Sequence, residues 1–456
     1  MKNRCVMLAA LIVLVLFSIS NVLAAGGRKG DKKVSKKEEE FKGITCRIWF
    51  WGEDKIPGIT DFFQESADLY HKSYPDVIWE VKHVDIDRVY SGFNEMIKTE
   101  DAPELHMLLG GAPGLEQAWS GNISPVSDYV SDEVLSRINP EARAEGYWSG
   151  KQWLAPIFLE PWLFGINRLI WEEAGLDPDR TPDTWTDFVD ALQKIKDAGY
   201  IPWVFGGGNG FYGASFQSAL QYQYYDSAAD YRRAIAGDET FTIEKHSGWW
   251  HLVQELRDRG LFNPDAAELS LAEGQDIFFE GNAGIFFDTH PQISAAAREM
   301  GEDVIDVMIV PVPGKGAFKG KLPVPAVCAG IPSIARYKEE AGKFLEYLLS
   351  KERQNALYEK TGVFPAADYL KRTAIKRKID KKLYDWTVNN AAMTQTRNHP
   401  AVLEEAVYMI TQEFFTANIS AEQAAQMYGD AVQAWRGSTP KVVENFRTWA
   451  EGDLPF

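Results

Sequence analysis

A glycine-rich segment is the sharpest conventional motif in this sequence. Residues 208–213 read Gly-Asn-Gly-Phe-Tyr-Gly, a match to G-x-G-x-x-G after an apolar run that predicts a strand. A dinucleotide site also needs a second strand, with an acidic residue at its end about 20 residues on. Here Gln217 to Tyr231 continues as a polar and aromatic helix. We therefore interpret the segment as a flexible turn that lines a binding cleft, and not as a nucleotide site.

Other residue patterns do not predict catalytic or metal chemistry. The seven histidines lack H-E-x-x-H spacing, and His246 with His251 has no acidic third ligand nearby in sequence. The sequence contains no G-x-S-x-G elbow, no phosphate-loop lysine motif and no metal-type cysteine spacing. We predict no catalytic residue, no metal and no cofactor.

Alternating apolar runs and amphipathic stretches predict α/β layers in which ligand-binding residues follow the strands. The first hundred residues after position 43 predict βαβαβ, and ligands of such open sheets sit beyond the carboxyl ends of the strands. This rule indicates Trp51, Glu53 and Asp54 after the first strand, and Gly110 and Gly111 after the third. The predicted strands are Ile44 to Trp51, Val77 to Val84 and Leu105 to Leu109, and the helices between them are Ile59 to Lys72 and Arg88 to Lys98.

Further elements follow the same alternation until the C-terminal third, which is almost wholly helical. Later strands are predicted near Ile157-Phe158, Val204-Phe205, Gly284 to Phe287, Ile305 to Val310 and Val327 to Ile331. Helices are predicted at Thr184 to Ala198, Ser215 to Tyr225, His246 to Arg259, Glu339 to Leu349 and Ala421 to Arg436.

Length and charge restrict the class of protein. With 456 residues, 45% of them hydrophobic, the chain can build at least two cores. A formal net charge of -17 disfavours nucleic acid and anionic membrane surfaces as partners, because like charges repel. Fifteen tryptophans either fill cores or offer flat faces to ligands. The composition favours a soluble protein with a neutral ligand.

The N-terminal residues predict secretion. Residues 1–25 combine a positive start, an apolar run from Val6 to Ile19 and small residues up to Ala25, which is typical of a cleaved signal peptide. The run, of about 14 residues, is shorter than the roughly 20 that a membrane-spanning helix needs. Residues 26–42 are rich in Lys and Glu and predict a flexible charged leader. We expect a periplasmic or otherwise secreted protein, cleaved near Ala24 or Ala25.

Two cysteines remain after such cleavage. Cys46 and Cys328 could form a disulfide only if their Cα atoms came within about 7 Å. Each lies in an apolar run, which favours two separate buried thiols.

Several segments, taken in order, resemble the extracellular solute-binding proteins, family 1, of bacterial ABC sugar importers, the class that includes maltose-binding proteins. These segments span Ile44 to about Trp435, and the resemblance implies a non-enzymatic protein. It implies the carbohydrate-binding component of an ABC importer, expected to be a monomer, that docks transiently on the transmembrane subunits of the permease. The segments are residues 48–55, 153–176, 184–188, 278–285, 341–349 and 361–366.

The resemblance also implies a fold: an α/β, two-lobed periplasmic-binding-protein (Venus-flytrap) fold with three inter-lobe crossovers and a helical C-terminal region. The crossovers are expected near Ala155 to Phe158, near Phe287 to His290 and near Cys328 to Pro332. Lobe one would hold residues 43–156 and 288–328, and lobe two residues 157–287 and 329–456. Ligand would stabilise a closed state by contacting both lobes.

A candidate ligand site joins the strand-end residues with those that the resemblance adds. Carboxylates and amides can bind sugar hydroxyls, and aromatic faces can pack on sugar C–H surfaces. The candidates are Trp51, Glu53, Asp54, Gly110, Gly111, Glu160, Trp162, Asn209, Phe211, Tyr212, Asp288, His290 and Phe364.

Each candidate has a structural alternative. Trp51, Trp162 and Phe364 could pack in the core, Glu53 or Asp54 could be a helix N-terminal charge, and Asp288 could cap a helix. The sequence also departs from the family, because the third crossover lacks an aromatic-glycine segment and no Trp lies near Asp288-Thr289-His290.

Two other functions fit the same residues. A secreted glycoside hydrolase would also be acidic and Trp-rich and needs only two carboxylates at the sugar bond. The strands, however, are not interleaved into the eight βα units of a barrel. A sugar sensor that signals to a receptor without transport is the third possibility.

Overall fold

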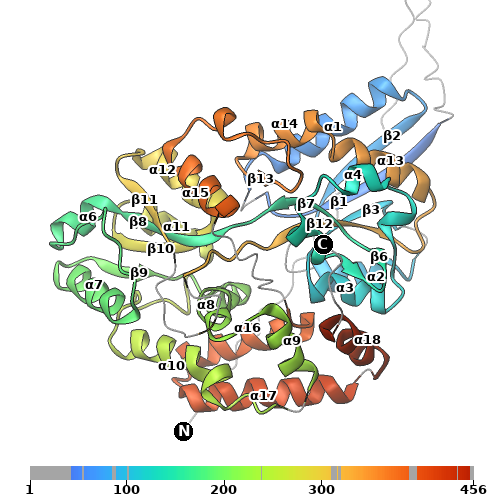
Figure 1. The fold of residues 1–456 in the computed structure, drawn as a ribbon. Coiled ribbons are helices and arrows are strands. Elements are labelled where there is room, and N and C mark those ends of the chain that lie inside the picture. The colour runs from blue at the N-terminus through green and yellow to red at the C-terminus, as the bar shows by residue number, and fades with distance from the viewer. Residues whose placement is uncertain are drawn as a thin grey trace, which may run out of the picture. The chain divides into compact units, whose positions relative to one another are not determined.

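Two β-sheets contain most of the strands in the computed structural model, which describes residues 43–451 apart from 54–55, 85–88, 100–101, 238, 310–315, 317–319, 390–397 and 439 (Figure 1). The predicted signal peptide and leader lie outside the described residues. The α/β class and the helical C-terminal region are confirmed.

The first sheet has seven strands in the order β13-β7-β12-β3-β1-β2, with β4 pairing β12. Strands β1, β2 and β3 are parallel, as the predicted βαβαβ unit requires, and β12 is antiparallel to both β3 and β7. The strands are β1 (Ile44–Phe50), β2 (Val77–His83), β3 (Leu105–Leu109), β4 (Ile123–Ser124), β7 (Ala155–Leu159), β12 (Ala326–Pro332) and β13 (Phe364–Pro365).

The second sheet has four strands in the order β11-β8-β10-β9. Strand β8 is antiparallel to both of its neighbours, whereas β9 and β10 are parallel. The strands are β8 (Trp162–Asn167), β9 (Ile201–Val204), β10 (Ala283–Thr289) and β11 (Ile305–Met308), and a separate hairpin joins β5 (Tyr147–Trp148) to β6 (Lys151–Gln152).

The chain passes between the sheets at residues 160–161, because β7 belongs to the first sheet and β8 to the second. The strand pairing contradicts the next predicted crossing, near Phe287 to His290, because the chain stays in the second sheet after these residues. After β10 the chain turns through a helix and β11 fills the free edge of β8, so the return to the first sheet falls between Met308 and Ala326. The third crossing, expected near Cys328 to Pro332, differs too, because β12 lies wholly in the first sheet. The division into lobes stays a prediction.

The helices cover the sheets and form the C-terminal third. Thr184 and Ser270 start α7 and α11 with side chains that accept backbone N–H groups, and Ser270 forms a capping box with Glu273. Up to the second sheet's last strand the helices are α1 (Ile59–Ser73), α2 (Val89–Met96), α3 (Ala112–Trp119), α4 (Asp132–Leu135), α5 (Pro140–Ala144), α6 (Arg168–Glu173), α7 (Trp185–Asp197), α8 (Ala214–Leu220), α9 (Ala228–Ala236), α10 (Glu244–Asp258), α11 (Leu271–Phe279) and α12 (His290–Met300). The later helices are α13 (Lys338–Leu348), α14 (Lys351–Thr361), α15 (Lys378–Asn389), α16 (Ala401–Thr416), α17 (Ala421–Ser438) and α18 (Pro440–Glu451), and short 3-10 helices include η3 (Gly210–Gly213) and η5 (Arg372–Ala374).

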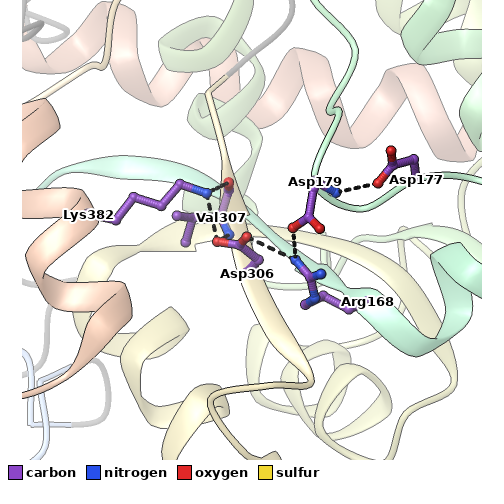
Figure 2. Close-up of polar contacts among 6 residues, drawn as sticks. All are labelled: Arg168, Asp177, Asp179, Asp306, Val307 and Lys382. Carbon is purple, nitrogen blue, oxygen red and sulfur yellow. Dashed lines mark hydrogen bonds and ion pairs between the residues drawn. The ribbon is translucent and has the colours of Figure 1, made fainter.

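Charged side chains fasten α15 to the second sheet. Asp306 on β11 accepts from Lys382 Nζ at 2.8 Å and from Arg168 Nη1 at 3.3 Å (Figure 2). Arg168 also pairs with Asp179 at 2.8 Å, and Lys382 donates to the carbonyl of Val307 at 3.2 Å. The half-buried carboxylate thus joins β11 to α6 and α15.

Cys46 and Cys328 are both buried and are not joined in a disulfide, which confirms the prediction of two separate thiols. Cys46 lies on β1 opposite Trp79, and Cys328 lies on β12 opposite Leu108. No helix among the described residues is long and apolar enough to span a bilayer.

Candidate ligand-binding site

Strand direction brings several predicted residues to one edge of the first sheet. Val327 on β12 is opposite both Leu109 and Phe158, so β3 and β7 are parallel and end at the same edge, where β1 also ends. Strand β13 begins at this edge, because Phe364 pairs with Leu159. The predicted residues at this edge are Trp51, Glu53, Gly110, Gly111, Glu160 and Phe364.

A second group gathers at the carboxyl edge of the second sheet. Thr289, the last residue of β10, pairs with Trp162, the first residue of β8. Strand β9 runs parallel to β10 and ends beside it, so the loop that carries residues 209–212 starts from the same edge. The predicted residues here are Trp162, Asn209, Phe211, Tyr212, Asp288 and His290.

At the end of β1, the polar groups bind the protein itself. Trp51 is buried, and its Nε1 donates to the carbonyl of Met107 at 3.1 Å. Glu53 accepts from the backbone N–H groups of Gly58 at 2.9 Å and Thr60 at 2.7 Å, at the start of α1. Burial alone would raise the pKa of Glu53, but these bonds, with the Thr60 hydroxyl, hold it below its usual value. The structural alternatives for both residues are therefore present, and Asp54 lies outside the described residues.

Gly110 and Gly111 pack against a buried carboxylate at the end of β3. Gly111 has a φ of 76° and donates its N–H to the carbonyl of Glu145 at 2.8 Å. A Cβ on Gly110 would lie 2.3 Å from Oε2 of Glu145, and this oxygen also accepts from the N–H of Ala326 at 3.1 Å. Gly110 is required because the Glu145 carboxylate leaves no room for a side chain, and Gly111 is required because its φ angle is positive.

Glu160 and Trp162 lie in the segment that joins the sheets. Glu160 is buried, and its N–H donates to the carbonyl of Pro325 at 2.9 Å, while the Trp162 N–H donates to Pro323 at 2.9 Å. The half-buried Trp162 ring lies 5.8 Å from the ring of Phe287. Both backbone positions are fixed by the irregular segment 323–325 that precedes β12.

Tyr212 and Asp288 meet around the end of β10. The hydroxyl of Tyr212 donates to the carbonyl of Phe287, and burial, followed by the charge of Asp288, raises the pKa of Tyr212 well above its usual value. Asp288 is fully buried, and its two oxygens accept from the N–H of Thr289 at 2.6 Å and from Gln275 Nε2 at 3.0 Å. The carboxylate therefore holds the end of β10 to α11.

His290 and Phe364 join the two sheets through a buried acid. Their rings stack with centroids 4.2 Å apart, and His290 Nε2 donates to Asp380 Oδ1 at 3.2 Å. Asp380 also accepts from the hydroxyls of Ser294 and Tyr358. Burial would raise the pKa of Asp380, but its bond to His290 and its other partners lower it below the ordinary value.

The glycine-rich loop is bound to neighbouring backbone. Gly207 and Gly208 donate to the carbonyls of Ala266 and Leu269, each at 2.7 Å, and a Cβ on Gly208 would lie 2.5 Å from the carbonyl oxygen of Glu268. The side chain of Asn209 accepts from the N–H of Leu271 at 2.8 Å. The glycines thus serve close packing, and the half-buried Phe211 follows on η3.

Three polar residues beside the site were missed by the sequence analysis: Glu145, Gln275 and Asp380. Each lies in a helix or at a helix end, and its partner lies elsewhere in the chain. Asp380 is surrounded by lysines and arginines, a pattern that does not itself predict a binding site. Within the described residues, no cluster of His, Cys, Asp or Glu could hold a metal ion.

Known proteins share this sequence pattern and this fold. The chain is 22% identical to Diacetylchitobiose binding protein DasA of Streptomyces coelicolor, over 77% of this chain and 80% of that protein. A structure from a study of xylan utilization by Caldanaerobius polysaccharolyticus aligns with a TM-score of 0.75 and 17% identity, over 85% of this chain and 99% of that chain. A chitin oligosaccharide binding protein aligns with a TM-score of 0.75 and 17% identity, over 86% of this chain and 98% of that chain.

The structural likeness confirms the predicted fold class of periplasmic binding proteins. The relatives in sequence and structure include binding proteins, and the family itself is one of extracellular binding proteins. Residues 57–355 match the family described as bacterial extracellular solute-binding protein, and the chain belongs to that family.

Proposed function

We propose that this protein binds a carbohydrate between its two lobes and delivers it to the permease of an ABC importer, without chemical conversion. One observation carries the proposal: the predicted residues gather at the carboxyl edges of two sheets that the chain joins at residues 160–161. In open α/β sheets this is where ligands bind.

The side chains at these edges suit a neutral polyhydroxyl ligand. Trp162 and Phe211 are half-buried aromatic residues next to acceptors and backbone amides, a combination that pairs C–H faces with hydroxyls. The relatives named for diacetylchitobiose and chitin oligosaccharides support an oligosaccharide as the first ligand to test.

The test is calorimetric titration with chitin, xylan and malto-oligosaccharides. Trp162→Ala is expected to weaken binding of the active sugar by at least about tenfold, because an aromatic platform is lost. Trp185→Ala is the matched control, since Trp185 is also half-buried but lies on α7 and bonds Glu255 at 2.9 Å. Absence of heat with every sugar, or equal weakening by both variants, contradicts the proposed site.

The proposed lack of catalysis is tested on the same sugars. Incubation with the sugar that binds should leave its chain length unchanged by mass spectrometry, whereas cleavage would support the glycoside hydrolase. No observation among the described residues favours a hydrolase over a binding protein.

Lobe closure and export complete the proposal. Binding is expected to reduce the radius of gyration in X-ray scattering, because one ligand contacts both of the proposed lobes. The exported protein is expected to begin near residue 25 or 26 by N-terminal mass spectrometry. Loss of sugar uptake on deletion, with restored uptake on complementation, distinguishes transport from sensing.

A further inference from the structure

A dense group of cations lies in η5 and the start of α15. Residues 371–382 contain seven Lys or Arg and one Asp, although the whole chain carries a net charge of -17. Five of these cations line a shallow hollow of about 450 Å³, together with Glu302 and Asp385. We call this the basic surface, and define it as Arg372, Lys376, Lys378, Lys381 and Lys382.

The basic surface opposes the stability of the helix that carries it. Lys378 and Lys381 lie in the first turn of α15, where the helix dipole favours negative charge. Lys378 and Lys382 are four residues apart on the same helix face, so their charges repel. The helix dipole and the repulsion between the lysines both lower the stability of α15. In a chain with an excess of acidic residues, such a cation cluster is unexpected unless a binding partner outside the chain offsets this loss of stability.

Acids of the protein neutralise only part of this charge. Asp385 forms two bonds to Arg372, at 2.6 and 2.8 Å, and Asp306 binds Lys382 (Figure 2). Glu302 accepts from the backbone N–H of Lys378 at 3.4 Å. Among the described residues, Lys376, Lys378 and Lys381 form no side-chain ion pair, and Lys376 and Lys378 are exposed.

The chemistry of the surface indicates phosphate headgroups more than a protein. Protein interfaces are enriched in aromatic residues and Arg and depleted in Lys. Here four of the five cations are lysines, and the large hydrophobic side chains that are exposed among the described residues all lie outside η5 and α15. Clusters of Lys and Arg of this size attract anionic lipid surfaces.

We propose that the basic surface docks the protein, weakly and reversibly, on the phosphate headgroups of an anionic lipid bilayer. Apart from the charged leader (26–42), the rest of the chain is acidic and is repelled by such a bilayer, which favours approach through this surface. None of the five residues of the basic surface is a candidate ligand-binding residue, and the inference does not depend on which sugar is bound.

The test is sedimentation of the exported chain with vesicles of equal parts phosphatidylglycerol and phosphatidylcholine, at low salt. Wild type is expected to bind these vesicles and not pure phosphatidylcholine. The triple variant Lys376→Gln, Lys378→Gln, Lys381→Gln is expected to lose between about tenfold and a hundredfold in affinity. Binding should weaken steeply as salt shortens the screening length to a few ångströms.

The control variant removes the same charge elsewhere. Its substitutions are at exposed positions on α1, α7 and α14, namely Lys72→Gln, Lys194→Gln and Lys351→Gln. The charged leader (26–42) is unchanged in both triple variants. This variant should bind as wild type does. Equal loss in both triple variants, binding unaffected by either, no binding by wild type, or displacement by inorganic phosphate at constant ionic strength would each overturn the proposal.

Discussion

The carboxyl ends of the two sheets hold similar residue types but use them differently. At the end of the first sheet, Trp51 bonds to Met107 on the neighbouring strand β3, and Glu53 bonds to the start of α1, so both partners lie in the same βαβαβ unit. At the second, His290 contacts Phe364 and Asp380, which come from a strand of the other sheet and from α15. Placement at a strand end is therefore common to these residues, but Trp51 and Glu53 stabilise one βαβαβ unit, whereas His290 joins elements that are distant in sequence.

The largest effect is expected from removing the acid that joins distant elements. Asp380→Ala leaves His290, Ser294 and Tyr358 without their shared acceptor, so the free energy of unfolding should fall by about 3–5 kcal/mol. Urea denaturation measures this change. Because the folded pKa of Asp380 is lowered, its contribution is present above the unfolded pKa and is lost as pH falls through the folded value. A decrease of less than about 1 kcal/mol in the free energy of unfolding would mean that the Asp380 cluster stabilises the protein no more than Glu53 does at the end of the first sheet.

An intermediate effect is expected at the end of β3. Gly110→Ala places a methyl group 2.3 Å from Oε2 of Glu145, which should cost about 1–3 kcal/mol through forced displacement. Gly437→Ala is the control, since nothing lies within 4 Å of its Cβ and it sits within α17. The control should stabilise the protein by up to about 1 kcal/mol in thermal unfolding. Equal effects would remove the case for close packing at this edge.

The smallest effect is expected from the helix-capping acid. Glu53→Gln removes the charge and leaves one acceptor oxygen for the two N–H groups of Gly58 and Thr60, which should cost about 1 kcal/mol at neutral pH. The folded pKa of Glu53 is lowered, so the difference from wild type should vanish as pH falls through that value. Chemical denaturation at neutral and acidic pH measures it, with the exposed Glu80→Gln as control. A difference that persists in acid would exclude the charge as its cause.

Local patterns in the sequence predicted the elements well where apolar runs were uninterrupted. The predicted strand at Leu105 to Leu109 coincides with β3, and the predicted helix from Ile59 extends one residue further, to Ser73. Strand β8 was not predicted as a strand, because Trp162 to Asn167 follows a proline and was interpreted only as part of a crossover. The position of β11 depended on an open edge of β8, a long-range property that no local pattern carries.

The candidate site was predictable as a set of strand ends, but the partners of its residues were not. Glu53 was recognised as a possible helix charge because α1 follows closely in sequence. Asp380 lies 90 residues from His290, and only the fold brings the two together. Whether the thirteen candidates touch a ligand stays a prediction.

Chemical modification of the two buried thiols can report local or global unfolding of this protein. Burial raises the pKa of Cys46 far above the ordinary value for a thiol, so neither an alkylating reagent nor an oxidant should modify it in the native state. Cys46 on β1 and Cys328 on β12 lie on different strands of one sheet. In the exported chain, which is expected to lack Cys5 of the signal peptide, alkylation of both thiols at equal rates would identify global unfolding. Faster modification of one thiol would reveal which strand detaches first.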